Sequence, residues 1–349
     1  MIAELYDKTL FVILLSTAWC AASLYPVLGP VATVGYLVWG YSFILLAVLD
    51  SQLNNKLIRF LYTASFLGVG YTALLTPLLV GLTLLNTLVF QYAGYNYASL
   101  TVYIAVGSAT ILSLYAVSKS YYVAVRQETI DLGLDTEYSV AHISDLHIGA
   151  TLGARRLQNV AQTIEDIDPD FTVITGDIFD GSGWPNQATL QPLASIDDIY
   201  VSRGNHDYYF GGQALEQLHN IGATVLANEA TKVQDIYLAG VDDIEYPNQI
   251  PSQEIDSLSD QSEQASILLY HRPDETEAFK DSTFNIMLSG HTHNGQIYPV
   301  KWLSSFSYKY LYGLHTFGEQ YLNVTSGAGT GGPMMRLGTK NEVCLITIT

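Results

Sequence analysis

The stretch Ser139-Val-Ala-His-Ile-Ser-Asp145-Leu-His147 gives the first indication of the architecture. It begins as a short run of β-type residues and ends in a carboxylate and an imidazole. In α/β sheets, ligand sites assemble at the carboxyl ends of the strands. The stretch therefore predicts a strand over Ser139–Ser144 that delivers Asp145 and His147 to such a site.

Four further motifs repeat this arrangement, because each of them follows a short apolar run. In chain order they are Gly176-Asp-Ile-Phe-Asp180, Gly204-Asn-His-Asp207, His271 and Gly290-His-Thr-His293. The glycines at 176, 204 and 290 permit tight turns or a close backbone approach before the ligand. Any one motif is common by chance, whereas all five in this order predict a shared metal centre.

The donor atoms limit the chemistry of this centre. Nearly all the candidate ligands are carboxylate, amide or imidazole groups, and no thiol lies nearby in the sequence. Such donors suit Mn, Fe, Zn or Mg ions that work on phosphate, and they are not typical of a structural zinc site. Of these metals we favour Mn.

From about Glu128 the chain alternates β-type runs with segments of helical spacing. Apolar residues recur at helical intervals in Ala154–Asp166, and a second helix is predicted from about Gly212 to Ile221. Strands that alternate with helices predict an α/β domain. The predicted strands are Ser139–Ser144, Phe171–Thr175, Ile199–Ser202, Ile236–Ala239, Ala265–Tyr270, Phe284–Leu288, Tyr321–Val324 and Val343–Ile348.

The charge is divided unevenly along the chain. Of 15 Lys and Arg residues and 33 Asp and Glu residues, only five basic and three acidic residues lie in positions 1–126. The remainder therefore has a formal net charge of about −20. Because such an acidic domain repels a nucleic-acid backbone, we expect no nucleic-acid partner. We attribute the acidity to solubility.

Residues 1–126 are predicted to form a transmembrane helical domain, separate from residues 127–349. Four apolar stretches lie at roughly 9–25, 29–49, 60–90 and 98–118. Each reaches or approaches the ~20 residues that a helix needs to cross the hydrocarbon core. A cleaved signal peptide would explain only the first stretch. The near absence of charge disfavours a buried helical core.

The basic residues of this domain predict its orientation. Lys8 precedes the first stretch, Lys56 and Arg59 lie between the second and the third, and Lys119 and Arg126 follow the fourth. By the positive-inside rule, four spans with both ends in the cytoplasm fit this distribution. The second domain is therefore expected to be cytoplasmic.

The five motifs together resemble the calcineurin-like metallophosphoesterase superfamily, over essentially the whole chain after about residue 138. The segments Gly290–Gln296 and Ser326–Gly338 are similar to its bacterial membrane-associated branch, some members of which hydrolyse UDP-2,3-diacylglucosamine. The resemblance implies a four-layer fold, in which two β-sheets pack face to face and are flanked by helices. It also implies an integral protein of the bacterial inner (cytoplasmic) membrane.

The resemblance further implies a ligand set for two divalent metal ions. The first ion is assigned to Asp145, His147 and His293, the second to Asn205, His271 and His291, and Asp177 bridges both. A shared carboxylate and a bridging hydroxide hold two cations about 3.5–4 Å apart, and the hydroxide is the nucleophile toward phosphorus. The cations also neutralise charge on the phosphoryl oxygens.

Other polar residues near the motifs have two interpretations each. His206 resembles the family's non-ligand histidine, which is expected to donate a proton or hydrogen bond to the leaving oxygen, and Asp180 is expected to orient it. The alternatives are a structural loop histidine and a turn or cap residue. Arg203 and Arg272 either contact substrate phosphate or form surface ion pairs. Strand alternation turns His142 away from His147, which predicts a structural role.

The segment Tyr298–Tyr321 is unusually aromatic and includes Lys301 and Lys309. Aromatic and cationic side chains suit a membrane interface. We therefore expect an amphipathic lid that grips an acyl chain or enters the membrane surface. The alternative is packing against its own domain.

These observations predict a membrane-anchored, dinuclear metal-dependent phosphohydrolase. The favoured partner is a phosphoester substrate, namely a phosphodiester or pyrophosphate in a lipid-linked or nucleotide-lipid compound. One alternative is a broad-specificity phosphodiesterase or phosphomonoesterase that acts on soluble compounds. Another is a non-catalytic membrane sensor on the same fold, which the complete set of expected ligands disfavours.

Overall fold

The computed structural model describes residues 2–53, 55–149, 152–180, 187–210, 212–243, 251–259 and 265–349. The chain divides into two compact units. The first, here called the helical unit, comprises Met1–Lys119 with Ile297–Val300 and Gly332–Gly338. The second, here called the sheet unit, comprises Ser120–Gln296, Lys301–Gly331 and Thr339–Thr349.

Among the residues that the structure describes, three helices of the helical unit are long and apolar enough to cross a membrane. They belong to α1 (Ile2–Leu53), α2 (Lys56–Leu85) and α3 (Ala98–Lys119), and a π-helical turn, Asn86–Gln91, extends α2. The side chain of Asn55 caps α2 by accepting a 2.8 Å hydrogen bond from the main-chain nitrogen of Leu57. This cap satisfies a donor that the first turn of a helix leaves unpaired.

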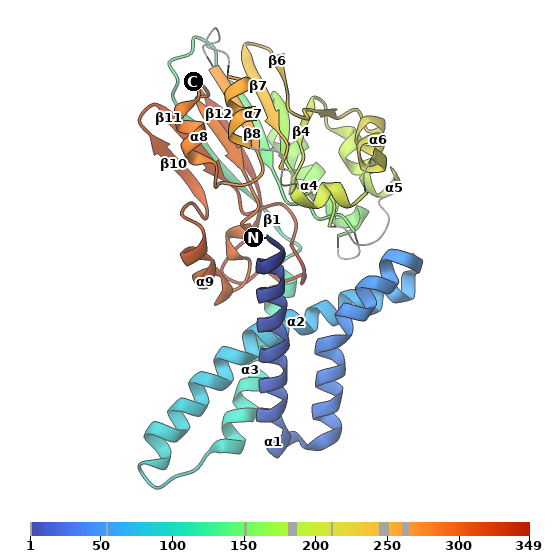
Figure 1. Ribbon diagram of the computed structural model, residues 1–349, viewed down its shortest axis with the longest axis vertical. Helices are drawn as coiled ribbons and strands as arrows, with labels where there is room; N and C mark the ends of the chain where they lie inside the picture. Colours follow the sequence, from blue (N-terminus) through green and yellow to red (C-terminus); the bar gives the residue numbers. More distant parts are fainter. Residues whose placement is uncertain are drawn as a thin grey trace. The chain divides into compact units, whose positions relative to one another are not determined.

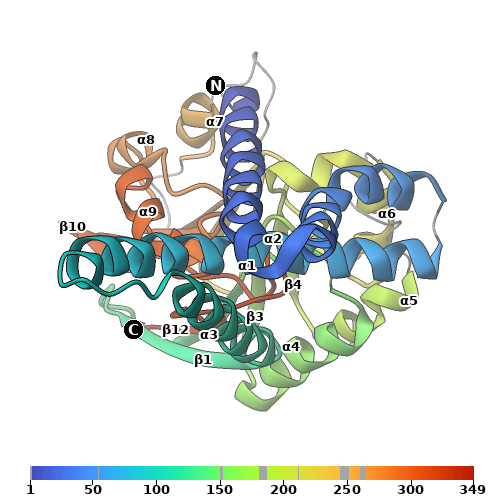
Figure 2. The same cartoon turned by 90° about the horizontal axis from the view of Figure 1, so that it is seen from below.

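α1 consists of two helices joined at Gly29, whose φ of 75° and ψ of 176° are not helical. Pro26 and Pro30 flank this glycine, and proline lacks the main-chain donor that a continuing helix needs. Figure 1 and Figure 2 both show the resulting change of direction. The hydroxyl of Tyr41 donates a 2.9 Å hydrogen bond to the carbonyl of Leu14, so the two halves pack together. All four predicted apolar stretches are therefore helical.

In the described part of the sheet unit, the strands form two six-stranded mixed sheets. The first sheet has the order β1-β12-β2-β3-β4-β5, with β2 to β5 parallel to one another. Its strands are β1 (Val123–Ile130), β2 (Tyr138–Ile143), β3 (Phe171–Thr175), β4 (Ile199–Ser202), β5 (Thr224–Val225) and β12 (Asn341–Ile348).

The second sheet has the order β10-β11-β9-β8-β7-β6, and antiparallel strands form its two edges. The four central strands run parallel to one another. The strands are β6 (Glu229–Val233), β7 (Ile236–Val241), β8 (Ala265–Tyr270), β9 (Ile286–Ser289), β10 (Gly313–Phe317) and β11 (Gln320–Val324).

The sheets pack face to face, because buried side chains of both, such as Val173 and Ile267, form one apolar cluster. A second cluster lies on the outer face of the first sheet and includes Leu157 of α4. A third lies on the outer face of the second sheet and includes Phe279 of α8. These four layers confirm the predicted metallophosphoesterase sandwich. The helices are α4 (Ala154–Ile167), α5 (Gln187–Leu190), α6 (Gly212–Asn220), α7 (Pro251–Ser257), α8 (Thr276–Asp281) and α9 (Val300–Ser307).

His142 lies on β2, fully buried, and its side chain bonds to groups of both sheets. The amide nitrogen of Asn323 is 2.8 Å from His142 Nδ1, and His142 Nε2 is 2.9 Å from the hydroxyl of Thr175. Because an amide nitrogen can only donate, Nδ1 accepts and Nε2–H donates to Thr175. These contacts agree with the predicted structural role of His142.

Candidate metal centre

The strand ends of both sheets converge on one group of polar side chains. Asp145 follows β2, Asp177 follows β3 and Asn205 follows β4, all in the first sheet. His271 follows β8, and His291 and His293 follow β9, in the second sheet. Both sheets therefore contribute residues to the group, as expected for carboxyl ends of parallel strands.

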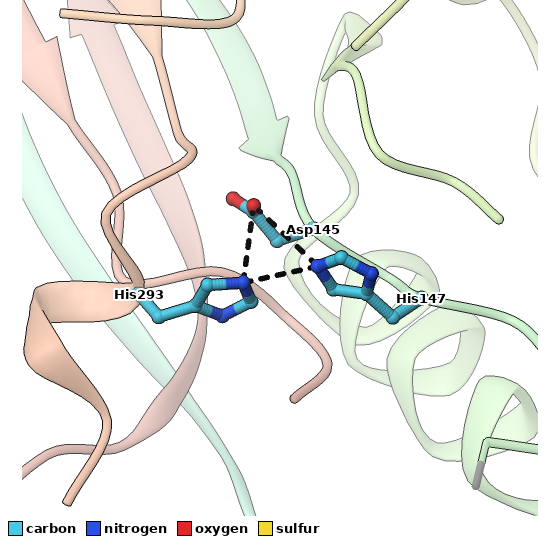
Figure 3. Close-up of side chains that lie close together, drawn as sticks. All are labelled: Asp145, His147 and His293. Carbon is cyan, nitrogen blue, oxygen red and sulfur yellow. Dashed lines mark hydrogen bonds and ion pairs between the residues drawn. The ribbon is translucent and has the colours of Figure 1, made fainter. Parts of the chain in front are cut away.

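Asp145, His147, which also follows β2, and His293 form the group drawn in Figure 3. The Nε2 atoms of His147 and His293 are 3.0 Å apart. Oδ1 of Asp145 is 3.4 Å from His293 Nε2 and 3.9 Å from His147 Nε2. The main-chain nitrogen of His291 donates to the Asp145 carboxylate at 3.0 Å, which fixes the carboxylate.

Asp177 stands between this group and a second one. Its Oδ2 atom is 3.8 Å from Nε2 of His147 and 3.2 Å from Nε2 of His271. Nδ1 of His291 is 3.3 Å from the same His271 nitrogen. One ligand atom from each of Asp177, His271 and His291 lies within 4.8 Å of the others, and the same holds for Asp177, His147 and His206.

The backbone at these positions is unusual. Five side chains of the centre project from residues with positive φ, a conformation that is uncommon outside glycine and costs free energy. They are Asp145 (53°), His147 (47°), Asp177 (52°), His291 (68°) and His293 (49°). Such strain accumulates at functional sites, because the surrounding structure must enforce it.

Burial and neighbouring charges act on the pKa values of the buried Asp and His side chains of the centre, often in opposite directions. Burial raises the pKa of Asp145 to about 6. Burial acts in the same direction on Asp177, but His271 and His206 outweigh it and hold the pKa of Asp177 well below its usual value. Burial opposes protonation of His271, yet the charge of Asp177 raises its pKa to about 10. Anionic and imidazole groups are thus packed close together in a buried setting.

The residues fit divalent cations. Two imidazole nitrogens 3.0 Å apart, as in His147 and His293, repel each other when both present lone pairs, and a cation relieves that repulsion. Oδ1 of Asn205 is buried and has no hydrogen-bond partner within the described ranges of the chain. A buried amide oxygen without a partner is costly, and a bound cation would satisfy it.

Comparison with known proteins identifies the family. A profile of the calcineurin-like phosphoesterase family matches residues 138–295. The chain is 31% identical over 255 residues to an uncharacterized metallophosphoesterase of Aquifex aeolicus (strain VF5), which covers 69% of this chain and 97% of that protein. The chain belongs to the calcineurin-like phosphoesterase family. It is therefore a metal-dependent phosphoesterase, as the resemblance predicted.

Two further relatives of this calcineurin-like phosphoesterase bear informative names. A "transmembrane protein with metallophosphoesterase domain" of Danio rerio is 31% identical over 226 residues, covering 59% of this chain and 52% of that protein. The chain thus spans about half the length of the zebrafish relative. The uncharacterized metallophosphoesterase YkuE of Bacillus subtilis (strain 168) is 29% identical over 240 residues, covering 64% of this chain and 83% of that protein.

The predicted proton donor lies beside the shared carboxylate. The main-chain nitrogen of His206 donates a 2.9 Å hydrogen bond to Oδ1 of Asp177. Its Nδ1 atom is 3.2 Å from the main-chain carbonyl oxygen of Asp180. The Asp180 carboxylate lies against Gly149, where an added Cβ would collide with it. Orientation of His206 by the Asp180 carboxylate itself stays a prediction.

Arg203 and Arg272 form ion pairs. Nε of Arg203 is 3.0 Å from Asp242 Oδ1, and Nε of Arg272 is 2.7 Å from Asp243 Oδ2. Both carboxylates are buried and both guanidinium groups are only partly exposed. Of the two interpretations offered by the sequence, the structure thus agrees with ion pairs, although these pairs are buried rather than on the surface.

Sequence reasoning gave no role to Asp207, the last residue of the Gly204–Asp207 motif. Its Oδ1 accepts hydrogen bonds from the main-chain nitrogens of Ile178 at 2.8 Å and Phe179 at 3.1 Å. Its Oδ2 accepts one from Gly204 at 2.8 Å. Asp207 therefore ties the loop after β4 to the loop after β3. Burial, reinforced by the charge of Asp177, raises the pKa of Asp207 to about 7.

Proposed function

We propose that this metallophosphoesterase is a membrane-anchored, dinuclear phosphohydrolase. The observation that carries the proposal is the position of Asp177, which belongs both to the group with His147 and to the group with His271 and His291. A carboxylate shared in this way suits a pair of cations. In this proposal Asp145, His147 and His293 hold one ion, Asn205, His271 and His291 hold the other, and Asp177 contacts both.

The bound ions supply Lewis acidity toward the phosphoryl group and lower the pKa of water. The protein's own residues position the reaction. Asp207 holds the loops that carry Asp177 and Asn205 at a fixed separation. We assign proton delivery to the leaving oxygen to His206, because its main chain is tied to Asp177 and its Nδ1 faces a carbonyl that only accepts.

Three long apolar helices of the described residues support the membrane anchor, as does the name of the zebrafish relative. The distribution of Lys and Arg favours a catalytic domain on the cytoplasmic side of a bacterial inner membrane. Because the sheet unit begins at Ser120, directly after α3, its centre is tethered to the bilayer. We therefore favour a phosphodiester or pyrophosphate in a lipid-linked or nucleotide-lipid substrate, with Mn as the metal.

The test begins with the full chain purified in detergent and supplied with Mn. We expect two metal ions per chain by elemental analysis, and hydrolysis of lipid pyrophosphates in a bacterial lipid extract, followed by mass spectrometry of the released products. Asp177→Asn should lose both properties, whereas Asp281→Asn, on the exposed surface of α8, should keep both.

Two results would redirect the proposal. A higher kcat/KM for soluble bis-p-nitrophenyl phosphate than for any lipid would favour the broad-specificity alternative. Full metal loading without hydrolysis of any phosphoester, together with an unchanged cellular phenotype of Asp177→Asn, would favour the sensor.

A further inference from the structure

Helix α9 exposes an apolar face. Trp302 is 57% exposed, Leu303 is 55% exposed and Phe306 is 73% exposed. Phe306 is three residues after Leu303 and four after Trp302, and residues at these spacings lie on one side of a helix. The rings of Trp302 and Phe306 are in edge contact, with centroids 5.0 Å apart. A contiguous patch of this kind indicates an interaction surface, which isolated exposed apolar residues do not.

The residues just before α9 are packed into the helical unit. Ile297 is buried in the same apolar cluster as Leu75 of α2 and Ala109 of α3. The main-chain nitrogen of Tyr298 donates a 3.0 Å hydrogen bond to the carbonyl of Leu337. Both of these segments, Ile297–Val300 and Gly332–Gly338, belong to the helical unit.

A second hydrogen bond shows where along α3 the segment Gly332–Gly338 is attached. The main-chain nitrogen of Arg336 donates at 2.9 Å to the carbonyl of Ala116, in the last turn of that helix. The helix ends at Lys119, where a basic residue follows an apolar span, as is typical of the boundary of the hydrocarbon core. The chain that enters α9 is therefore attached at the boundary end of α3.

The distance from this attachment to α9 is short. Val300 is two residues after Tyr298, and two residues span at most ~7 Å. Val300, the first residue of α9, is thus within ~7 Å of the segment that is attached at the end of α3. Trp and Phe on one face, with Lys301 and Lys309 nearby in the chain, form the composition that favours a membrane interface.

We propose that the apolar face of α9, formed by Trp302, Leu303 and Phe306, inserts into the headgroup region of the bilayer. This inference goes beyond the proposed function and does not depend on catalysis. It also links the bilayer to the metal centre. The ring of Tyr308, the residue after α9, contacts His291 with centroids 5.9 Å apart, and the Thr292 hydroxyl donates at 2.7 Å to the carbonyl of Leu311.

The experiment places a nitroxide label on α9 of the full chain in vesicles of phosphatidylethanolamine and phosphatidylglycerol. Leu303→Cys and Phe306→Cys are labelled in a background in which the two native cysteines, both buried, are replaced by Ala. Matched controls are Ser305→Cys, an exposed position on another side of α9, and Glu277→Cys on the exposed surface of α8. Collision rates with oxygen and with a water-soluble nickel chelate are measured by power saturation.

We expect labels at 303 and 306 to collide several-fold more with oxygen than with nickel, and the label at 277 to show the reverse. Equal nickel access at 303, 306 and 277 would overturn the proposal. Strong dipolar broadening at 306 without oxygen enrichment would also overturn it, because a second copy of the chain would then cover the face. Far-UV circular dichroism of each labelled variant verifies folding. The collision rates are informative even when no phosphoester is hydrolysed, so failure of the proposed function is recognised separately.

Discussion

Nδ1 of His271 donates a 2.7 Å hydrogen bond to the main-chain carbonyl of Thr175, the last residue of β3. A carbonyl oxygen only accepts, so Nδ1 carries a hydrogen, and Nε2, which is 3.2 Å from Asp177 Oδ2, is the nitrogen on which a cation would replace the proton. A residue of the second sheet is thus oriented by the backbone of the first. Such a bond fixes the tautomer that a metal-binding imidazole needs.

Replacing His271 by Gln should weaken metal binding by at least ~10-fold, because loss of an oriented ligand costs no less than loss of its supporting partner. Calorimetric titration of the metal-free protein with Mn measures the effect. His219→Gln is the matched control, because His219 is exposed on α6. Equal affinity of His271→Gln and the unaltered chain would remove His271 from the ligand set.

Gly204 lies against the shared carboxylate. A Cβ at this position would be 2.3 Å from Asp177 Oδ1 and 2.4 Å from the Asp177 main-chain nitrogen. We expect Gly204→Ala to displace Asp177 and to lower the number of metal ions per chain, measured by elemental analysis. Gly153→Ala is the control, because its φ is −108° and its Cβ would meet no atom within 4 Å. Normal metal content in Gly204→Ala would show that the added Cβ does not disturb metal binding by Asp177.

His206→Gln should lower kcat by ~10²–10⁴-fold for substrates with poor leaving groups. The loss should be much smaller for p-nitrophenol, which departs without a proton. Metal content should stay unchanged, because proton delivery rather than metal binding is assigned to this side chain. An equal loss for both leaving groups would argue that His206 acts through positioning alone.

Stability should depend on pH through His142. Burial, with a contribution from the charge of Arg126, lowers the pKa of His142 to about 3 in the folded chain, whereas an unfolded histidine titrates near 6.5. Between these values the unfolded state binds one more proton. The free energy of unfolding should therefore fall by ~1.4 kcal/mol for each pH unit as the pH is lowered from about 6.5.

The variant His142→Gln tests the direction of this pH dependence of stability. Glutamine does not titrate, and it retains a donor and an acceptor for Thr175 and Asn323. Thermal unfolding in detergent between pH 7 and pH 4.5 should show a smaller loss of midpoint temperature for His142→Gln than for the unaltered chain. Parallel pH profiles would mean that another group dominates the acid sensitivity.

Strands buried on both faces were predictable from the sequence. The bounds of β3, β4 and β8 agree with the predicted ranges, because continuous apolar runs end there at polar turns. β1 was not predicted. Its residues, Val123–Ile130, are mostly exposed or half-buried, and they follow the apolar span of α3 directly. β10 was missed because it lies within Tyr298–Tyr321, the aromatic segment that was assigned to a lid.

The site was predictable where a residue of a metal-binding type comes directly after a predicted strand. Parallel strands end at one edge, so the carboxylates and imidazoles after β2, β3, β4, β8 and β9 meet there. The role of Asp207 was not predictable, because its partners Ile178 and Phe179 are distant in sequence and bond only through their backbone. The partners of Arg203 and Arg272 likewise depend on tertiary packing.

The two late segments of the helical unit have a consequence for biosynthesis. Met335 is fully buried against Gly70 of α2, although 265 positions separate them in the sequence. The ribosome delivers α1, α2 and α3 to the bilayer long before Gly332–Gly338 is translated. The helices of the anchor can therefore complete their packing only after nearly the whole chain has been translated. Insertion of these helices and completion of their packing are separate events in time.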